Sequence, residues 1–151
     1  MRDKRFVAKH RGGSLSIEQH HQLTQWACYC SEHVLHLLDK RIDQRLENAL
    51  RVAKAWKLGR ASVGDARKAS LEAIAVANEA SDKTAIAVAH AVGHAVATTH
   101  MADHSLGSAW YALKAVKSAG RSIDEERTWQ NDQLPPEVRD LVLTPRKIRK
   151  L

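Results

Sequence analysis

The chain has little of what builds sheets, sharp turns or disulfide scaffolds. Its 151 residues include seven glycines, three prolines and 5% aromatic residues. Alanine is abundant instead, and β-branched residues come in short runs, so the composition favours helices over strands. The two cysteines, Cys28 and Cys30, would point about 200° apart on one helix and could not bridge. We therefore interpret both as reduced packing residues of a cytoplasmic protein.

We also expect neither a secretion signal nor a membrane span. The opening MRDKRFVAKHRGG is charged, and no apolar segment follows it. Residues 84–102 lack Asp, Glu, Lys and Arg, and at about 19 residues they are barely long enough to cross a bilayer. They are mostly alanine, valine and threonine with three histidines and a glycine, which is a weakly apolar mixture. This segment is predicted to be a buried helix.

The net charge of +7 comes from the two ends of the chain. Residues 1–11 sum to +4, residues 145–151 sum to another +4, and the 133 residues between them sum to −1. Nucleic-acid-binding domains more often carry a basic stripe on a folded face. The basic ends are therefore interpreted as solvated termini, with non-specific attraction of polyanions as the alternative.

Apolar residues recur at helical spacing along most of the chain, and nothing reads as a strand. The predicted helices cover residues 16–38, 43–58, 62–80, 82–102, 103–116, 122–130 and 135–143. We predict an all-α, single-domain irregular helical bundle of about five main helices plus short C-terminal helices. A small α-solenoid-like helix stack is the alternative, although no fixed motif recurs.

Three parts are expected along the chain. Residues 1–15 form a basic N-terminal arm, residues 16–143 form the helical domain, and residues 144–151 form a basic C-terminal tail. Pro145 is predicted to stop the last helix near Leu143, before that tail. Four tryptophans fall on four different predicted helices and are expected to fill core gaps that alanine leaves: Trp26, Trp56, Trp110 and Trp129.

A break is predicted inside the longest helical segment. One unbroken helix from Asp82 to Ser118 would be roughly 55 Å long. A compact domain of this size is only about 40 Å across. We therefore expect a break near residues 101–103, with Asp103 as the cap of the next helix.

Four of the nine histidines lie in this region as two H-x-x-x-H pairs: His90, His94, His100 and His104. Each pair lies on one helix face and could supply two zinc ligands. The metalloprotease pattern H-E-x-x-H is not met, because Ala91 stands where its glutamate would be. All four histidines cannot share one ion on a straight helix, since they span about 21 Å.

The break would still allow a corner where His100, Asp103 and His104 meet. A third histidine ligand, His33 or His36, would then have to come from the first helix. Acid–base chemistry is a second possibility, with Asp103 orienting a histidine, but no nucleophile motif accompanies it. The interpretation we favour is that the histidines pack in the core, so no catalytic residue, cofactor or metal is assigned.

The segment GHAVATTHMADHSLGSAWYALKA, residues 93–115, is similar to the signature of a bacterial family of immunity proteins associated with polymorphic toxins. The matching positions are Gly93, Ala95, Ala97, Thr98, His100, His104, Tyr111 and Ala112. Further similarity lies at Asp43, Ala55, Trp56, Gly59 and residues 66–69, whereas Ser105 replaces an expected alanine. The resemblance covers residues 40–118.

This resemblance implies an all-α cytoplasmic protein that binds and neutralises a cognate toxin and has no enzymatic activity. It assigns no inhibitory residues. Two alternatives stay open on the residues alone: a metal-dependent enzyme that uses the histidine corner, and a nucleic-acid-binding protein that uses the basic termini. The partner surface and the oligomeric state do not follow from the sequence.

Overall fold

Helix starts in the computed structural model, which describes residues 3–149, follow the capping residues of the sequence. Five capping side chains accept hydrogen bonds from backbone N–H groups in the first turn of a helix: Ser16, Asp43, Ser62, Asp82 and Ser122. Such bonds satisfy donors that the helix itself leaves open. The local signals therefore placed most helix starts to within a residue or two.

The described part of the chain contains seven α-helices and no β-strand, which confirms the all-α prediction. They are α1 (Ile17–Glu32), α2 (Gln44–Lys57), α3 (Val63–Glu79), α4 (Lys83–Ala97), α5 (His104–Ser118), α6 (Ile123–Asp132) and α7 (Pro136–Arg149). Three short 3-10 turns, η1 (Lys4–Phe6), η2 (Lys9–Arg11) and η3 (Leu35–Leu37), flank α1.

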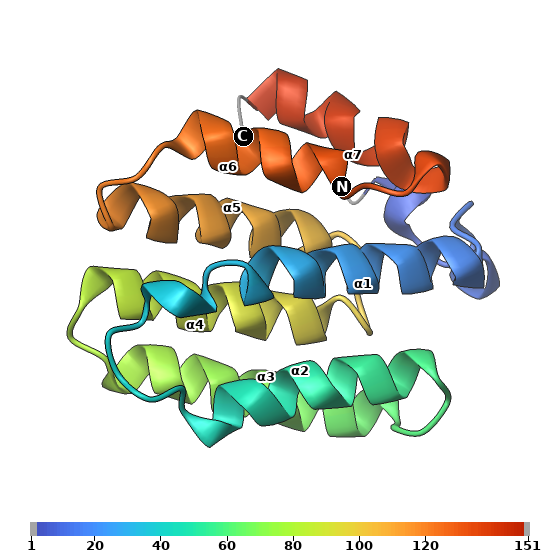
Figure 1. Ribbon diagram of the computed structural model, residues 1–151. Coiled ribbons are helices and arrows are strands. Elements are labelled where there is room, and N and C mark those ends of the chain that lie inside the picture. The colour runs from blue at the N-terminus through green and yellow to red at the C-terminus, as the bar shows by residue number, and fades with distance from the viewer. Residues whose placement is uncertain (1–2, 150–151) are drawn as a thin grey trace.

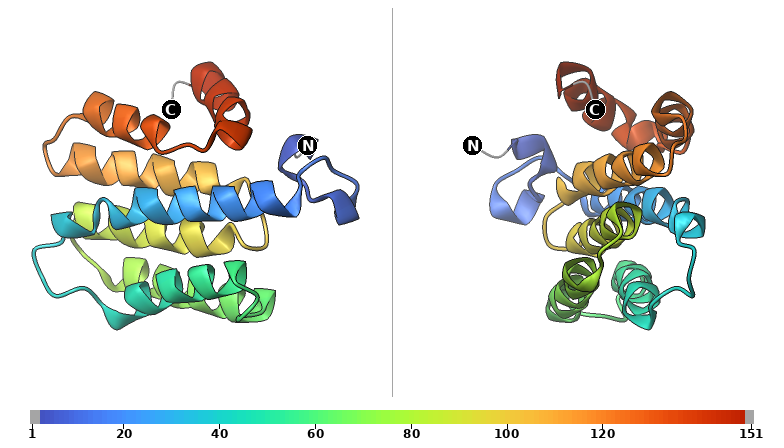
Figure 2. Two further views of the ribbon diagram at one scale, coloured as in Figure 1. Left: turned by 45° about the vertical axis from the view of Figure 1, so that its right-hand side comes forward. Right: turned by 90° about the vertical axis from the view of Figure 1, so that its left-hand side faces the viewer.

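Helix α4 is the centre of the bundle. It contacts α1, α2, α3 and α5, and ten of its 15 residues are buried. Figures 1 and 2 show α6, α5, α4 and the α2–α3 pair as successive layers, with α1 packed across α4 and α5. The weakly apolar segment is therefore a central buried helix, as predicted.

Two hydrophobic clusters pack on α4 and differ in side-chain size. The cluster with α2 and α3 has 14 buried residues, of which nine are alanine, so these helices approach closely. The cluster with α1, α5 and α7 uses larger side chains, among them Leu23, Trp26 and Leu106. Phe6 and Leu15, from the expected N-terminal arm, are buried in this second cluster as well.

The predicted break between α4 and α5 is present, but α4 ends at Ala97, before residues 101–103. The hydroxyls of Thr98 and Thr99 donate to carbonyls in the last turn of α4, at 2.9 and 2.8 Å. Hydroxyl groups that bind nearby backbone compete with helix continuation. Asp103 occupies the N-cap position of α5 as expected, but its side chain makes no capping hydrogen bond there.

Helix α7 continues through Pro145, whereas the sequence predicted an end near Leu143. Proline removes one backbone hydrogen bond from a helix interior. Contacts with α6 compensate for this lost hydrogen bond. The buried Arg146 guanidinium, directly after Pro145, donates to the side-chain oxygens of Gln130 and Asn131 on α6. Burial lowers the pKa of Arg146 to about 10.

Candidate functional site

Three of the four clustered histidines meet where α4 turns into α5. Ring centroids lie 5.0 Å apart for His94 and His104, and 5.6 Å apart for His100 and His104. We call His94, His100 and His104 the histidine corner. The sequence grouped His94 with His90 along the helix, but the turn folds the start of α5 back against the last turns of α4. That return joins His94 to the second histidine pair.

A hydrogen bond between two imidazoles closes the histidine corner. The Nδ1 atoms of His94 and His104 lie 2.9 Å apart, so one of them donates its N–H and the other accepts. Burial, together with the nearby His104 and His90, lowers the pKa of His94 to about 4. His94 is therefore neutral at pH 7, and this pair has the properties of a packing contact.

Gly107 leaves the space that the His94 ring fills. A Cβ atom at position 107 would lie 2.7 Å from His94 Nδ1 and 3.0 Å from its Cγ and Cε1. Those distances are shorter than van der Waals contact, so only glycine allows α5 to approach the ring this closely. The histidine corner thus depends on a glycine one helical turn after His104.

Tyr111 continues the aromatic contacts from the histidine corner along α5. Its ring stacks against His94 at 5.2 Å and against His90 at 4.8 Å, with interplanar angles of 20° and 22°. His90 is partly buried, and burial lowers its pKa. His90 is thus separated from the histidine corner by Tyr111 and faces a different environment.

The carbonyl of Thr98, just after α4, is bound by a histidine that the sequence did not single out. His20 of α1 donates from Nε2 to the Thr98 oxygen at 2.6 Å, and its ring lies 4.9 Å from Trp56 of α2. Burial lowers the pKa of His20. This contact ties three helices together beside the histidine corner, and no local pattern could have indicated it.

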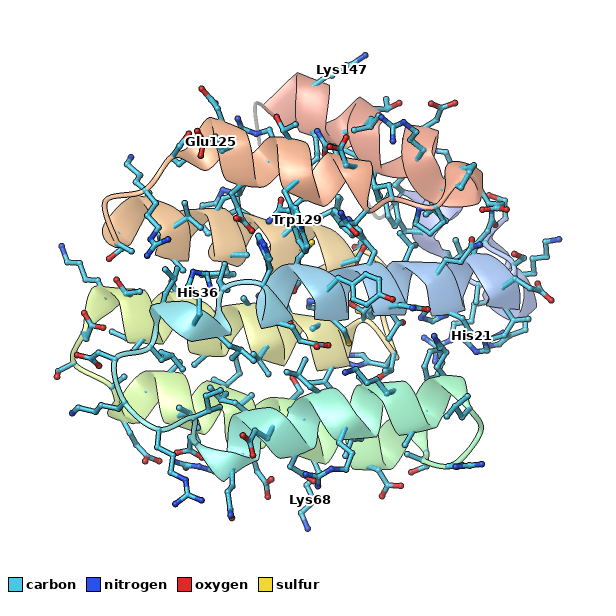
Figure 3. All side chains as sticks on the ribbon, viewed as in Figure 1. His21, His36, Lys68, Glu125, Trp129 and Lys147 are labelled. Carbon is cyan, nitrogen blue, oxygen red and sulfur yellow. The ribbon has the colours of Figure 1, made fainter. Side chains whose placement is uncertain are left out.

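Neither His33 nor His36, at the end of α1, joins the histidine corner. His33 binds Glu126 at 2.7 Å and stacks on Trp129 of α6 at 3.5 Å, and His36 lies beside it. Figure 3 shows His36 and Trp129 around the C-terminal end of α1, which runs antiparallel to α4. Among the residues that the structure describes, no group of three or more His, Cys, Asp or Glu side chains is arranged to hold a metal ion.

A groove of about 950 Å³ opens on the other side of Tyr111, between α4, α5 and α6. We call it the α4–α6 groove. Its twelve lining residues are Lys83, Ile86, Ala87, His90, Trp110, Tyr111, Leu113, Lys114, Lys117, Ser118, Ile123 and Arg127. Helix α6 packs less closely on α5 than α4 does, which leaves this space open.

The α4–α6 groove combines aromatic rings with positive charge. Four of its lining residues are Lys or Arg, and none is Asp or Glu. The Lys114 ammonium lies 4.9 Å from the centre of the Trp110 ring and 5.7 Å from that of Tyr111, in cation–π contact. Arg127 is paired with Asp124 at 2.9 Å, so the lysines carry the uncompensated charge.

Sequence reasoning missed this groove because it assigned Trp110 to the core. The structure leaves Trp110 38% exposed, so that assignment is wrong. The available signal was the spacing of Trp110, Lys114 and Lys117, which places all three on one helix face. The net charge of residues 12–144 did not reveal this basic face, because acidic residues elsewhere in that range offset the lysines.

The chain folds as an all-α domain built around the hairpin of α4 and α5, which carries both the histidine corner and the α4–α6 groove. The chain matches the family described as Imm-5 like putative immunity protein over residues 13–137. It belongs to that family, and the match extends beyond the resemblance at residues 40–118 to include α1 and α6. Neither a curated protein nor a solved structure was found to match the chain.

None of the helices within residues 3–149 combines the length and the apolar composition that a bilayer span requires.

Proposed function

We propose that this protein is an immunity protein that neutralises a cognate bacterial toxin by binding it directly. The observation that carries the proposal is the family match over residues 13–137. Neutralisation is stoichiometric and non-enzymatic in this proposal, and it takes place in the cytoplasm. The partner is the toxin itself, and no cofactor is required.

The arrangement of the histidines supports a binding role. The H-x-x-x-H pairs, the strongest candidates for chemistry, are engaged with one another and with Tyr111. Both cysteines are buried, and burial raises the pKa of Cys28 to about 12, so its thiol is unreactive. What the surface offers is the open α4–α6 groove, which suits recognition.

Co-expression with the product of a neighbouring gene tests the proposal. A bacterial host is transformed with an inducible copy of the neighbouring open reading frame, with and without this protein. Growth is expected to stop without the protein and to recover with it, and the two chains are expected to co-purify. A harmless neighbouring product, or rescue without a complex, contradicts the proposal.

A titration then separates binding from enzymatic neutralisation. Purified toxin is mixed with increasing amounts of this protein, and residual toxin activity is measured. Direct binding predicts a linear loss of activity that ends at a fixed molar ratio, whereas an enzyme would neutralise an excess of toxin with time. Complete neutralisation by a small fraction of the toxin concentration contradicts the binding mechanism.

A further inference from the structure

We infer that the α4–α6 groove is the docking site for an acidic segment of the partner protein, which seats an apolar side chain against the aromatic floor. The inference rests on the proposed function only in taking that partner to be the toxin. The chemistry of the recognised segment follows from the groove alone.

Three lysines give the α4–α6 groove its charge. Lys114 and Lys117 stand one turn apart on α5, with Cβ atoms about 5–6 Å apart. Lys83 begins α4 at the same end, because its neighbour Thr84 donates to Ser118 of α5 at 2.8 Å. Within the described residues, none of these three lysines has a carboxylate within ion-pair distance, so their charge is available to a partner.

The acidic first turn of α6 does not cancel this charge. Asp124 pairs with Arg127, and Glu126 binds His33 near the end of α1. Neither carboxylate lines the groove, and Glu125 is exposed on α6 (Figure 3). Carboxylates brought by a partner therefore find cations without competing acids, and complementary charge of this kind raises both association rate and specificity.

The floor of the groove selects an apolar side chain over a stacked nucleotide base. The stacking face of Tyr111 is engaged with His90, and the Lys114 ammonium covers a face of Trp110. Beside these rings lie the partly buried side chains of Ile86 and Ile123, which offer apolar contact. Nucleic acid binding without sequence preference relies on free aromatic faces, so an acidic peptide fits this surface better.

Peptide titration into the intact protein tests the inference without the toxin. The probe is a short fluorescent peptide rich in glutamate and leucine, with the same peptide carrying lysine for every glutamate as its control. Binding is followed by anisotropy, and isotope-labelled protein reports which amide signals move. We expect the acidic peptide alone to bind, with shifts confined to the groove-lining parts of α4, α5 and α6.

Charge reversal supplies the matched variants. Lys114→Glu combined with Lys117→Glu is expected to weaken acidic-peptide binding about 30-fold or more. Arg67→Glu combined with Lys68→Glu makes the same change in net charge on α3, where Figure 3 shows Lys68 far from α5 and α6, and is expected to change binding less than about threefold. Trp110→Ala is expected to weaken binding about tenfold, since the peptide loses its apolar contact.

Three results overturn the inference: equal effects of the two charge reversals, equal binding of the lysine peptide, or tighter binding of a short single-stranded oligonucleotide.

The toxin titration keeps this inference separate from the proposed function. If the Lys114→Glu, Lys117→Glu protein still neutralises the toxin at the same molar ratio, the groove is not the interface, although toxin binding stands. If the acidic peptide binds in the groove but no neighbouring product is toxic, the proposed function fails and the groove stands.

Discussion

The histidine corner and the α4–α6 groove lie on the same helical hairpin and share Tyr111, yet they differ in nearly every physical property. In the corner, imidazoles bind one another and a glycine admits them into close packing. In the groove, Trp110 is exposed, and the lysines share the lining with no Asp or Glu. The comparison teaches that a histidine-rich motif need not be where a protein acts, since the exposed face one turn further along α5 carries the surface available to a partner.

The largest stability effect is expected from filling the corner. Gly107→Ala should lower the free energy of unfolding by about 2–3 kcal/mol, because the new Cβ overlaps a ring held between Tyr111 and His104. Urea denaturation measures this change. Gly93→Ala is the control, since the one atom closer than 3 Å to its Cβ is the terminal methyl of Ile74 at 2.9 Å, and alanine improves helix propensity. A loss within about 1 kcal/mol is expected there, and equal losses for the two variants would contradict the role of Gly107.

A smaller loss of folding stability is expected when the pH is lowered. Because the pKa of His94 is lowered from 6.5 to about 4, the unfolded chain binds more protons than the folded chain between these values. Stability is therefore fully present above pH 6.5 and falls as the pH drops towards 4, by about 1–2 kcal/mol for this partly exposed ring. His20 and His90 act in the same direction.

The variant His94→Gln should flatten this pH dependence, because glutamine can still donate and accept but does not titrate in this range. Urea denaturation at several pH values between 6.5 and 4 gives the slope. His36→Gln, at an exposed position on η3, should leave the slope unchanged. A slope that is unaltered in His94→Gln would place the acid sensitivity elsewhere.

The smallest stability effect is expected in the groove. Lys114→Ala should change the free energy of unfolding by less than about 0.5 kcal/mol, because an exposed cation–π contact contributes little. Thermal or urea unfolding measures it beside Gly107→Ala. A loss as large as that of Gly107→Ala would show that the groove is part of the structural core, and the contrast between the two regions would disappear.

Much of the fold was predictable because its signals are local. Ser16, Ser62 and Ser122 start α1, α3 and α6 through hydrogen bonds to residues three positions away. Gly59 and Gly120, both with positive φ, follow the ends of α2 and α5. The central position of α4 follows from the absence of Asp, Glu, Lys and Arg after its first residue, Lys83. The end predicted near Leu143 was wrong because of a contact between segments distant in the sequence, since Arg146 binds α6 and α7 continues past Pro145. The exposure of Trp110 likewise depends on how α6 packs against α5.

The candidate sites were less predictable than the helices. Spacing correctly placed His90 and His94 on one helix, but it could not show that Tyr111 stacks against both rings or that His104 bonds to His94. Family membership, in contrast, was visible in the segment from Gly93 to Ala115, because a family signature needs no knowledge of contacts.

The sequence by itself determined where the helices form, which of them is buried and which family the chain belongs to. Helix propensity, capping and apolar spacing act within a few residues, so they can be evaluated before the chain is folded. Only the tertiary structure decided which histidines meet and which face of α5 remains open. Those outcomes depend on where α4 ends and on how closely α5 and α6 approach, and such distances arise from side-chain packing between segments far apart in the chain.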